Sequence, residues 1–290
     1  MTPAYAPARW EDPACPFCGA RERRPHERFG PGHVYRYVQC RPCGLVYLAP
    51  RPVYDQAFTD AAYGHYLKDP DHIRNNGRRN AREEVFYRQN RHVLDRMAAL
   101  LGRTGSVLEI GSSSGLFMLP ARDAGWEPFG LELSPVSVEA SRRVYGLEVR
   151  QAQYHTFDFD GRRFDAVYAS HVFEHIPDPN GWMALFRRDL VDDGLLVLQV
   201  PNQYALNRTL KRVLRGGVRH GRWDPAQTPD HLFEPHARPM RWLLERHGFE
   251  LLELCSYTHR TVRAEGPAQR WFHHRMVWGS NLRLIARKRP

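Results

Sequence analysis

The sequence predicts a doubly wound α/β fold with a seven-stranded sheet, its last strands antiparallel, and a small N-terminal zinc ribbon. Two observations carry this prediction. From residue 106 onward, strand-length apolar runs alternate with amphipathic segments of helical length, which is typical of a parallel sheet covered on both faces. Ahead of this region, four of the five cysteines form two C-x2-C pairs, a spacing typical of zinc ligands.

The chain has 290 residues, enough for one large domain and a small attachment. We expect a zinc ribbon at 13–48, a linker at 49–80 and the α/β domain at 81–290, with a lid insertion at 202–238. A composition of 42% hydrophobic and 26% charged residues excludes wholesale disorder. No apolar run approaches the roughly 18–20 residues of a membrane span, and residues 1–12 lack a secretory apolar core. We therefore expect a cytoplasmic protein.

The net charge of +10 comes almost entirely from arginine. Such a protein attracts phosphates and other acidic partners. A positive charge made mainly of arginine often reflects a GC-rich genome. It is therefore weaker evidence for a nucleic-acid partner than a mixture of lysine and arginine would be. We expect an anionic or sugar-like small-molecule partner, with polymeric nucleic acid as the alternative.

The cysteine pairs Cys15/Cys18 and Cys40/Cys43 can supply the four thiolates of a tetrahedral zinc site, each about 2.3 Å from the ion. A glycine directly follows each pair, where a metal knuckle turns sharply. Two disulfide bonds are the alternative, which a reducing cytosol disfavours. Because all four positions are cysteine, we expect a closed structural zinc. The fifth, Cys255, falls in an expected strand and is interpreted as a packed thiol.

The other elements follow in order. A long amphipathic helix at 81–101 is expected to end at glycine. The largely apolar run at 195–200 is typical of a strand buried on both faces, and the last two strands are expected to pair antiparallel. The expected strands are 106–110, 128–133, 147–150, 164–170, 195–200, 249–255 and 282–287, and the helices between them are 115–124, 135–145, 179–191 and 239–247.

The first of these strands runs into a loop of small residues, 111–115, and then into a helix. Glycine lets a ligand approach the backbone closely, and the helix N-terminus offers unpaired N–H groups. Glu132 ends the second strand, where a carboxylate can bind both hydroxyls of an adenosine ribose. A nicotinamide-dependent dehydrogenase is disfavoured because G-x-G-x-x-G is absent. A strand–turn–helix without a ligand is the other alternative.

On these motifs, residues 106–200 resemble the core of class I S-adenosylmethionine-dependent methyltransferases, which have a Rossmann-like fold. The family motif is hydrophobic-acid-x-Gly-x-Gly-x-Gly; this chain keeps Glu109, Gly111 and Gly115 and has Ser113 at the middle glycine. The resemblance implies S-adenosylmethionine as cofactor, with Glu109 orienting the loop and the methionine amine. It implies that Glu132 binds the ribose and Gln153 meets the adenine. The further cofactor contacts expected are Ser112, Ser113, Leu133 and Ser170.

A polar segment follows the fourth strand, where an open α/β sheet binds its ligands. Methyl transfer is an in-line displacement in which a base can take a proton from the acceptor, and histidine suits that role. We interpret His175 with Glu174, and then His171, as catalytic candidates. His231 in the insertion is a fourth. The alternative is that the Glu-His pair only closes the loop or contacts the cofactor.

The layout of residues 13–256 also resembles a narrower group of bacterial methyltransferases, in which a C-x2-C…C-x2-C module precedes a Leu-Ala-Pro-Arg-Pro joint. The group includes sugar C-methyltransferases of antibiotic pathways and enzymes of surface-polysaccharide clusters. In the sugar enzymes, a Glu-His pair at the place of Glu174 and His175 serves in deprotonation next to a ketone. Their further C-terminal domain has no counterpart here, so the resemblance implies O-methylation at least as strongly as C-methylation. The expected acceptor is a sugar or nucleotide-linked sugar.

The insertion begins with an amphipathic, basic segment at 206–215. We interpret it as a lid whose arginines bind a phosphate or carboxylate, or alternatively as a solvated helix face. Residues 257–280, rich in tryptophan and histidine, are expected to form either a homodimer contact or a wall of the pocket. The basic residues of the lid are Arg208, Lys211, Arg212, Arg215, Arg219 and Arg222.

Three functions therefore compete. The first is methyl transfer to a small molecule in natural-product or glycan biosynthesis. The second is an RNA methyltransferase that holds RNA with the ribbon and the basic insertion, although the ribbon is not markedly basic. The third is a zinc-ribbon scaffold with a vestigial core. The intact set of Glu109, Gly111, Gly115 and Glu132 argues against the third.

Overall fold

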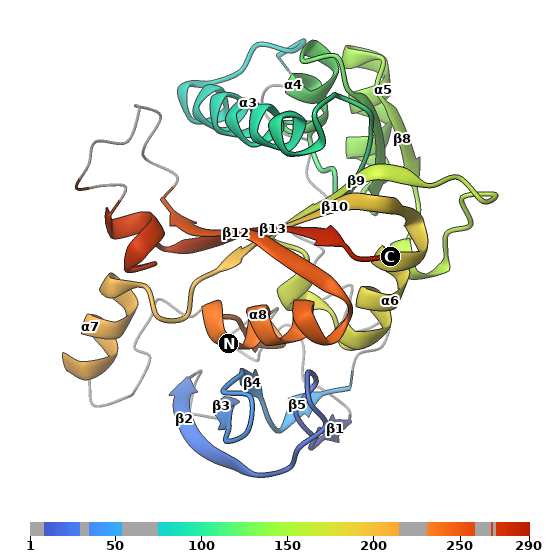
Figure 1. Cartoon of the computed structure of the whole chain (residues 1–290). Helices are drawn as coiled ribbons and strands as arrows, with labels where there is room; N and C mark the ends of the chain where they lie inside the picture. The colour runs from blue at the N-terminus through green and yellow to red at the C-terminus, as the bar shows by residue number, and fades with distance from the viewer. Residues whose placement is uncertain (1–8, 30–34, 54–74, 215–230, 259–267, 269–270) are drawn as a thin grey trace.

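A seven-stranded sheet forms the centre of the molecule in the computed structural model (Figure 1). Its strand order is β12-β13-β10-β9-β6-β7-β8. The last five strands are parallel, and β13 pairs antiparallel with both of its neighbours, β10 and β12. The predicted doubly wound fold is confirmed. The strands are β6 (Ser106–Ile110), β7 (Glu127–Glu132), β8 (Glu148–Gln151), β9 (Phe164–Ser170), β10 (Leu190–Pro201), β12 (Phe249–Tyr257) and β13 (Asn281–Lys288).

Helices cover both faces of this sheet. On β6, Val107 packs with the core under α3, whereas its neighbour Leu108 packs with the core on the opposite face. Successive side chains of a strand point to opposite faces, so a strand buried on both sides is mostly apolar along its length. The helices are α3 (Ala81–Leu101), α4 (Met118–Asp123) and α5 (Pro135–Tyr145) toward one face, and α6 (Pro179–Asp189) and α8 (Ala237–Arg246) toward the other (Figure 1).

Helix α3 begins and ends where the sequence predicts. The Asn80 side chain accepts a hydrogen bond from the Glu83 N–H, and the Glu83 side chain accepts one from the Asn80 N–H, which is a capping box. Gly102 ends the helix with a φ of 75°. The expected boundaries differ most in two places: α4 begins at Met118 because the preceding residues form turns, and β10 begins already at Leu190, directly after α6 ends at Asp189.

The cysteine region forms a second sheet, of four strands in the order β11-β4-β3-β2. Strand β11 (Phe233–Glu234) comes from the insertion and pairs antiparallel with β4 (Val46–Leu48). The insertion therefore contributes to the ribbon sheet as well as to the α/β domain, whose boundaries stay predictions. The other strands are β2 (Arg23–Phe29) and β3 (Tyr35–Cys40), with β1 (Trp10–Glu11) and β5 (Arg51–Pro52) as a separate pair.

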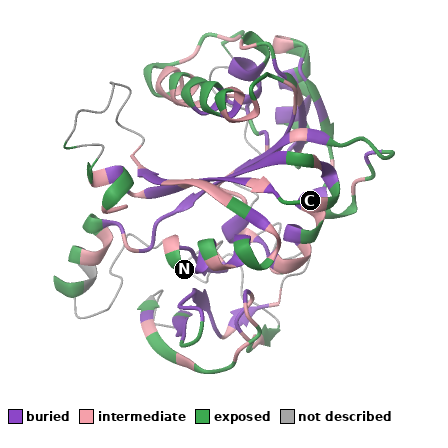
Figure 2. Ribbon diagram, in the orientation of Figure 1, coloured by how far each residue is buried: buried purple, intermediate pink, exposed green. Residues whose placement is uncertain are grey.

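The structure describes residues 9–29, 35–53, 75–214, 231–258, 268 and 271–290. Most of the expected linker and the arginines at 215, 219 and 222 lie outside them. Within the described ranges, no helix is both long and apolar enough to cross a membrane. The start of the insertion forms α7 (Leu206–Leu214), as predicted, but its apolar side chains face outward; Leu210 is 56% and Val213 70% exposed (Figure 2).

Candidate functional site

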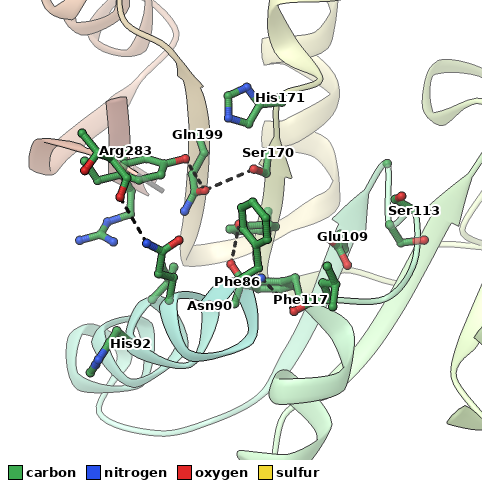
Figure 3. A pocket seen from close by; sticks show the side chains of 18 of the residues that line it. Phe86, Asn90, His92, Glu109, Ser113, Phe117, Ser170, His171, Gln199 and Arg283 are labelled. Carbon is green, nitrogen blue, oxygen red and sulfur yellow. Dashed lines mark hydrogen bonds between the residues drawn. The ribbon is translucent and has the colours of Figure 1, made fainter. Parts of the chain in front are cut away.

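A cavity of about 650 Å³ lies at the carboxyl ends of β6, β9 and β10, beside α3 (Figure 3). Of the residues predicted for the cofactor or catalysis, Glu109, the loop 111–113, Ser170 and His171 line it. Gly115, Glu132, Leu133, Gln153, Glu174, His175 and His231 do not. Tyr257 and His274 come from the 257–280 segment. Residues that the sequence did not predict complete the wall, among them Phe86, Gln89, Asn90, Gln199 and Arg283.

The missed wall residues had one signal in the sequence. Gln89 is polar but lies on the inward stripe of α3, where an apolar residue is expected. Across the cavity, Gln199 accepts hydrogen bonds from Ser170 at 3.2 Å and Tyr257 at 2.8 Å (Figure 3). His274 places part of the 257–280 segment in the cavity wall, the second of the two roles considered for it.

The loop after β6 has an unusual backbone. Gly111, Ser113 and Gly115 have φ values of 73°, 44° and 75°. A Cβ on Gly111 would lie 2.7 Å from Val172 Cγ2, and one on Gly115 would lie 2.8 Å from Leu147 Cδ1. Both glycines are therefore required by close approach as well as by conformation, whereas Ser113 accepts a left-handed conformation that a non-glycine residue rarely adopts.

Glu109 is buried at the cavity wall. Among the described residues, its Oε2 has no hydrogen-bond partner. Burial, and then the negative charge of Glu132, raise the pKa of Glu109 well above its usual range. A buried, unsatisfied carboxylate oxygen at the wall of a cavity is suited to a cationic group that enters the cavity. The site therefore fits the ammonium group of S-adenosylmethionine.

Glu132 ends β7, and its carboxylate accepts three backbone hydrogen bonds. The donors are the N–H groups of Ser113 at 2.6 Å, Leu133 at 2.7 Å and Ser134 at 2.9 Å. A carboxylate has about four acceptor positions, so capacity for a further donor remains. Leu133 beside it is 44% exposed, and Gln153, in the loop after β8, is exposed as well.

Three histidines surround a single oxygen of Glu174. Oε1 lies 3.2 Å from Nδ1 of His171, 4.0 Å from Nε2 of His175 and 3.9 Å from Nε2 of His231. Glu174 and His175 lie on the short helix η4 (Phe173–His175), which follows β9. The structure thus brings together all four residues that the sequence proposed for catalysis, including His231 from the insertion.

The Glu174 side chain is completely buried. Burial acts to raise its pKa, but the His171 hydrogen bond and the charges of the histidines outweigh burial and hold the pKa below its ordinary value. Ligands of a first-row divalent ion at about 2.0–2.1 Å lie roughly 3.0–3.4 Å apart. The spacings of 3.9 and 4.0 Å to His231 and His175 are wider. The ligand atoms of Glu174, His175 and His231 lie within 4.8 Å of one another and would have to move closer together to bind a metal ion.

Glu234 is a site residue that sequence reasoning missed. It is buried on β11, and its carboxylate lies 3.3 Å from Nδ1 of His231 and 2.6 Å from the Arg208 guanidinium. Arg208 is therefore paired with a carboxylate of the protein, and the phosphate role of the lid arginines stays a prediction. No pattern in the sequence marked Glu234, because a two-residue strand shows no periodicity.

The four predicted zinc ligands meet in one place. The sulfur atoms of Cys15, Cys18, Cys40 and Cys43 all lie within 4.8 Å of one another, and the pairs Cys15–Cys43 and Cys18–Cys40 are 3.5 Å apart. The hydrogen bond between Cys15 and Cys43 lowers the pKa of Cys43 and, together with burial, raises the pKa of Cys15. Four converging cysteine sulfur atoms fit a tetrahedral metal ion.

A profile of the family described as "Methyltransferase domain" matches residues 79–254. The ubiquinone biosynthesis O-methyltransferase of Cereibacter sphaeroides is 26% identical over 141 residues, which are 44% of this chain and 56% of that protein. The chain thus spans little more than half the length of such a curated relative.

Solved structures show the same fold. The 1,6-didemethyltoxoflavin-N1-methyltransferase of Burkholderia thailandensis has a TM-score of 0.54 and 16% identity, and the match covers 87% of this chain and 97% of that one. An S-adenosylmethionine-dependent methyltransferase from Clostridium acetobutylicum has a TM-score of 0.53 and 10% identity, with 71% and 92% covered. At these identities the likeness concerns the fold alone.

Proposed function

This chain belongs to the methyltransferase domain family, and we propose that it transfers the methyl group of S-adenosylmethionine to a hydroxyl of a small-molecule acceptor. The cluster at the end of β9 carries this proposal. His171 lines the cavity and shares Glu174 Oε1 with His175 and His231. A hydroxyl becomes a strong nucleophile when a positioned base accepts its proton during the attack. The O-methyltransferases among the relatives agree with oxygen as the attacked atom.

S-adenosylmethionine supplies an electrophilic methyl group on its sulfonium. Glu109 Oε2 would accept a hydrogen bond from the ammonium group of this cofactor. The Glu132 carboxylate would accept hydrogen bonds from its ribose hydroxyls. Exposed Leu133 would cover the adenine, with Gln153 at its edge. The remaining residues proposed to hold the cofactor are Gly111, Ser112, Ser113, Gly115 and Ser170.

The acceptor must be small because the cavity of about 650 Å³ also has to admit the methionine part of the cofactor. Proton removal falls to the histidine cluster, whose imidazoles share one buried carboxylate. A sugar or nucleotide-linked sugar stays the predicted acceptor class. The ribbon cysteines are proposed to bind a structural zinc ion.

The test combines methyl-labelled S-adenosylmethionine, the purified protein and a cell extract separated into small molecules, glycans and RNA. We expect label in the small-molecule or glycan fraction. His175→Ala should lower this transfer by about 10²-fold or more, with cofactor affinity kept, while His155→Ala, an exposed histidine outside the cluster, should have no effect. Label confined to RNA, or full activity of His175→Ala, would contradict the proposal.

A further inference from the structure

We propose that the cysteine ribbon forms part of the methyl-transfer site. It holds His231 beside Glu174 and, through Glu234, determines which ring nitrogen of His231 carries the proton. The reaction itself rests on the proposed function. The positioning of His231 does not, and it can be tested without knowing the acceptor.

The backbone connects the ribbon to the catalytic cluster through one residue. Leu232 donates its N–H to the carbonyl of Glu174 at 2.9 Å, and its own carbonyl accepts the N–H of Leu48 on β4 at 2.9 Å. On the neighbouring ribbon strand, the Tyr37 hydroxyl donates to the carbonyl of His231 at 2.9 Å. His231 is thus held from the ribbon side by β3 and β4, and the segment that carries it is tied to η4.

Side chains strengthen the same connection. Phe17 lies between Cys15 and Cys18, and its ring packs 5.2 Å from Phe233 and 6.4 Å from Phe173. Phe173 and Phe233 also pack 5.8 Å from each other. These phenylalanines directly precede Glu174 and Glu234. The first cysteine knuckle therefore supports the two carboxylates that face His231.

The second knuckle is held in a similar way. His236 Nε2 lies 2.9 Å from the carbonyl of Gly44, which follows Cys43. Burial lowers the pKa of His236 to about 4, so the ring is neutral near pH 7, and Nε2 must carry its proton because a carbonyl only accepts. This bond holds the end of β11 against the turn that contains the second cysteine pair.

Glu234 determines the tautomer of His231. The carboxylates of Glu234 and Glu174 only accept hydrogen bonds, and Glu234, paired with Arg208, lies closer to the ring: 3.3 Å from Nδ1, against 3.9 Å between Glu174 and Nε2. A single ring proton of His231 is therefore held on Nδ1. Nε2, which faces Glu174 and His175, then has the lone pair that a general base needs. Glu234 is accordingly a positioning residue. Where zinc binds the four cysteines, it would hold both knuckles, and with them β4 and β11, in place.

The experiment reads the tautomer directly. The full chain is labelled with 15N at histidine, saturated with S-adenosylhomocysteine, and studied by long-range 1H–15N NMR at pH 8. The His231 signal is identified by its loss in His231→Gln. We expect the Nδ1–H form in the wild type and a shift toward the Nε2–H form in Glu234→Gln, whose amide can donate. Removal of zinc by a chelator, checked by metal analysis, should abolish the single tautomer while S-adenosylhomocysteine affinity is retained.

Tyr37→Phe keeps the metal but removes one contact to His231, and it should broaden or split the His231 signal. Arg36→Ala, on the exposed side of the same strand, is the matched control and should change nothing. If zinc removal also abolishes S-adenosylhomocysteine binding, Tyr37→Phe decides the question. The inference is overturned if Tyr37→Phe leaves the His231 tautomer unchanged. It is also overturned if zinc removal or Glu234→Gln leaves the tautomer unchanged in protein that still binds S-adenosylhomocysteine. If the His231 tautomer changes when the ribbon is perturbed but no small molecule is methylated, the proposed function fails and this inference stands.

Discussion

Replacing Glu109 by glutamine should stabilise the cofactor-free protein while weakening the cofactor complex. Burial and the charge of Glu132 raise the pKa of Glu109 well above the value of 4.5 for the free side chain. Between these two pKa values the native state binds a proton that the unfolded state does not. Stability therefore falls as pH rises through this window, and glutamine, which does not titrate, removes the loss.

The size of the effect follows from linkage. One proton contributes up to about 1.4 kcal/mol per pH unit. The free energy of unfolding of Glu109→Gln relative to wild type should thus increase by up to about 3 kcal/mol between pH 5 and 7. Urea unfolding at pH 5, 6 and 7 without cofactor measures this difference. Glu127→Gln, at an exposed position on the neighbouring strand, is the control and should give a difference that is flat with pH.

Cofactor binding should change in the opposite direction. A hydrogen bond to a charged group contributes about 1.5–3 kcal/mol, so losing the Glu109 carboxylate should raise the Kd for S-adenosylmethionine roughly 10–150-fold. In the wild type, binding of the ammonium group should release the Glu109 proton, and affinity should rise with pH. The reasoning is refuted if the stability difference is independent of pH, or if calorimetry finds equal affinities for wild type and Glu109→Gln.

Three further predictions concern the same regions. Glu132→Ala removes the acceptor of three N–H groups and should cost about 1–3 kcal/mol of stability in addition to cofactor affinity; calorimetry that finds unchanged affinity would rule out its ribose role. Gly111→Ala should destabilise the protein by about 1–3 kcal/mol, because its Cβ meets Val172 at a φ of 73°. Gly125→Ala, with a positive φ but open space, should cost less in the same thermal melts. Plasma emission analysis should find one zinc ion per chain, and Cys40→Ser should lose it; zinc-free wild type would contradict the ribbon assignment.

Local patterns explain what the sequence could predict. The strands around Val107 and Leu198 are mostly apolar, and the glycine loop lies between a strand and a helix, so both features can be recognised from a few neighbouring residues. His171, Glu174 and His175 were predicted together because they are close in sequence and follow a parallel strand, whose carboxyl end faces the ligand. That these side chains share one oxygen of Glu174 could not be predicted, because it depends on packing distances.

Glu234 has no signal in the sequence because its burial depends on residues that are distant along the chain. A charge is buried only when a partner compensates it, and the partner here, Arg208, lies on α7 while the strand that holds Glu234 pairs with the ribbon. Three segments distant in sequence therefore decide the state of one carboxylate. The sequence displays the ribbon and the insertion as separate attachments, yet neither places His231 alone: the insertion carries the histidine, and the ribbon supplies the strand against which it is held. Loss of either part is accordingly expected to lower the rate of proton transfer more than it lowers the affinity for the cofactor.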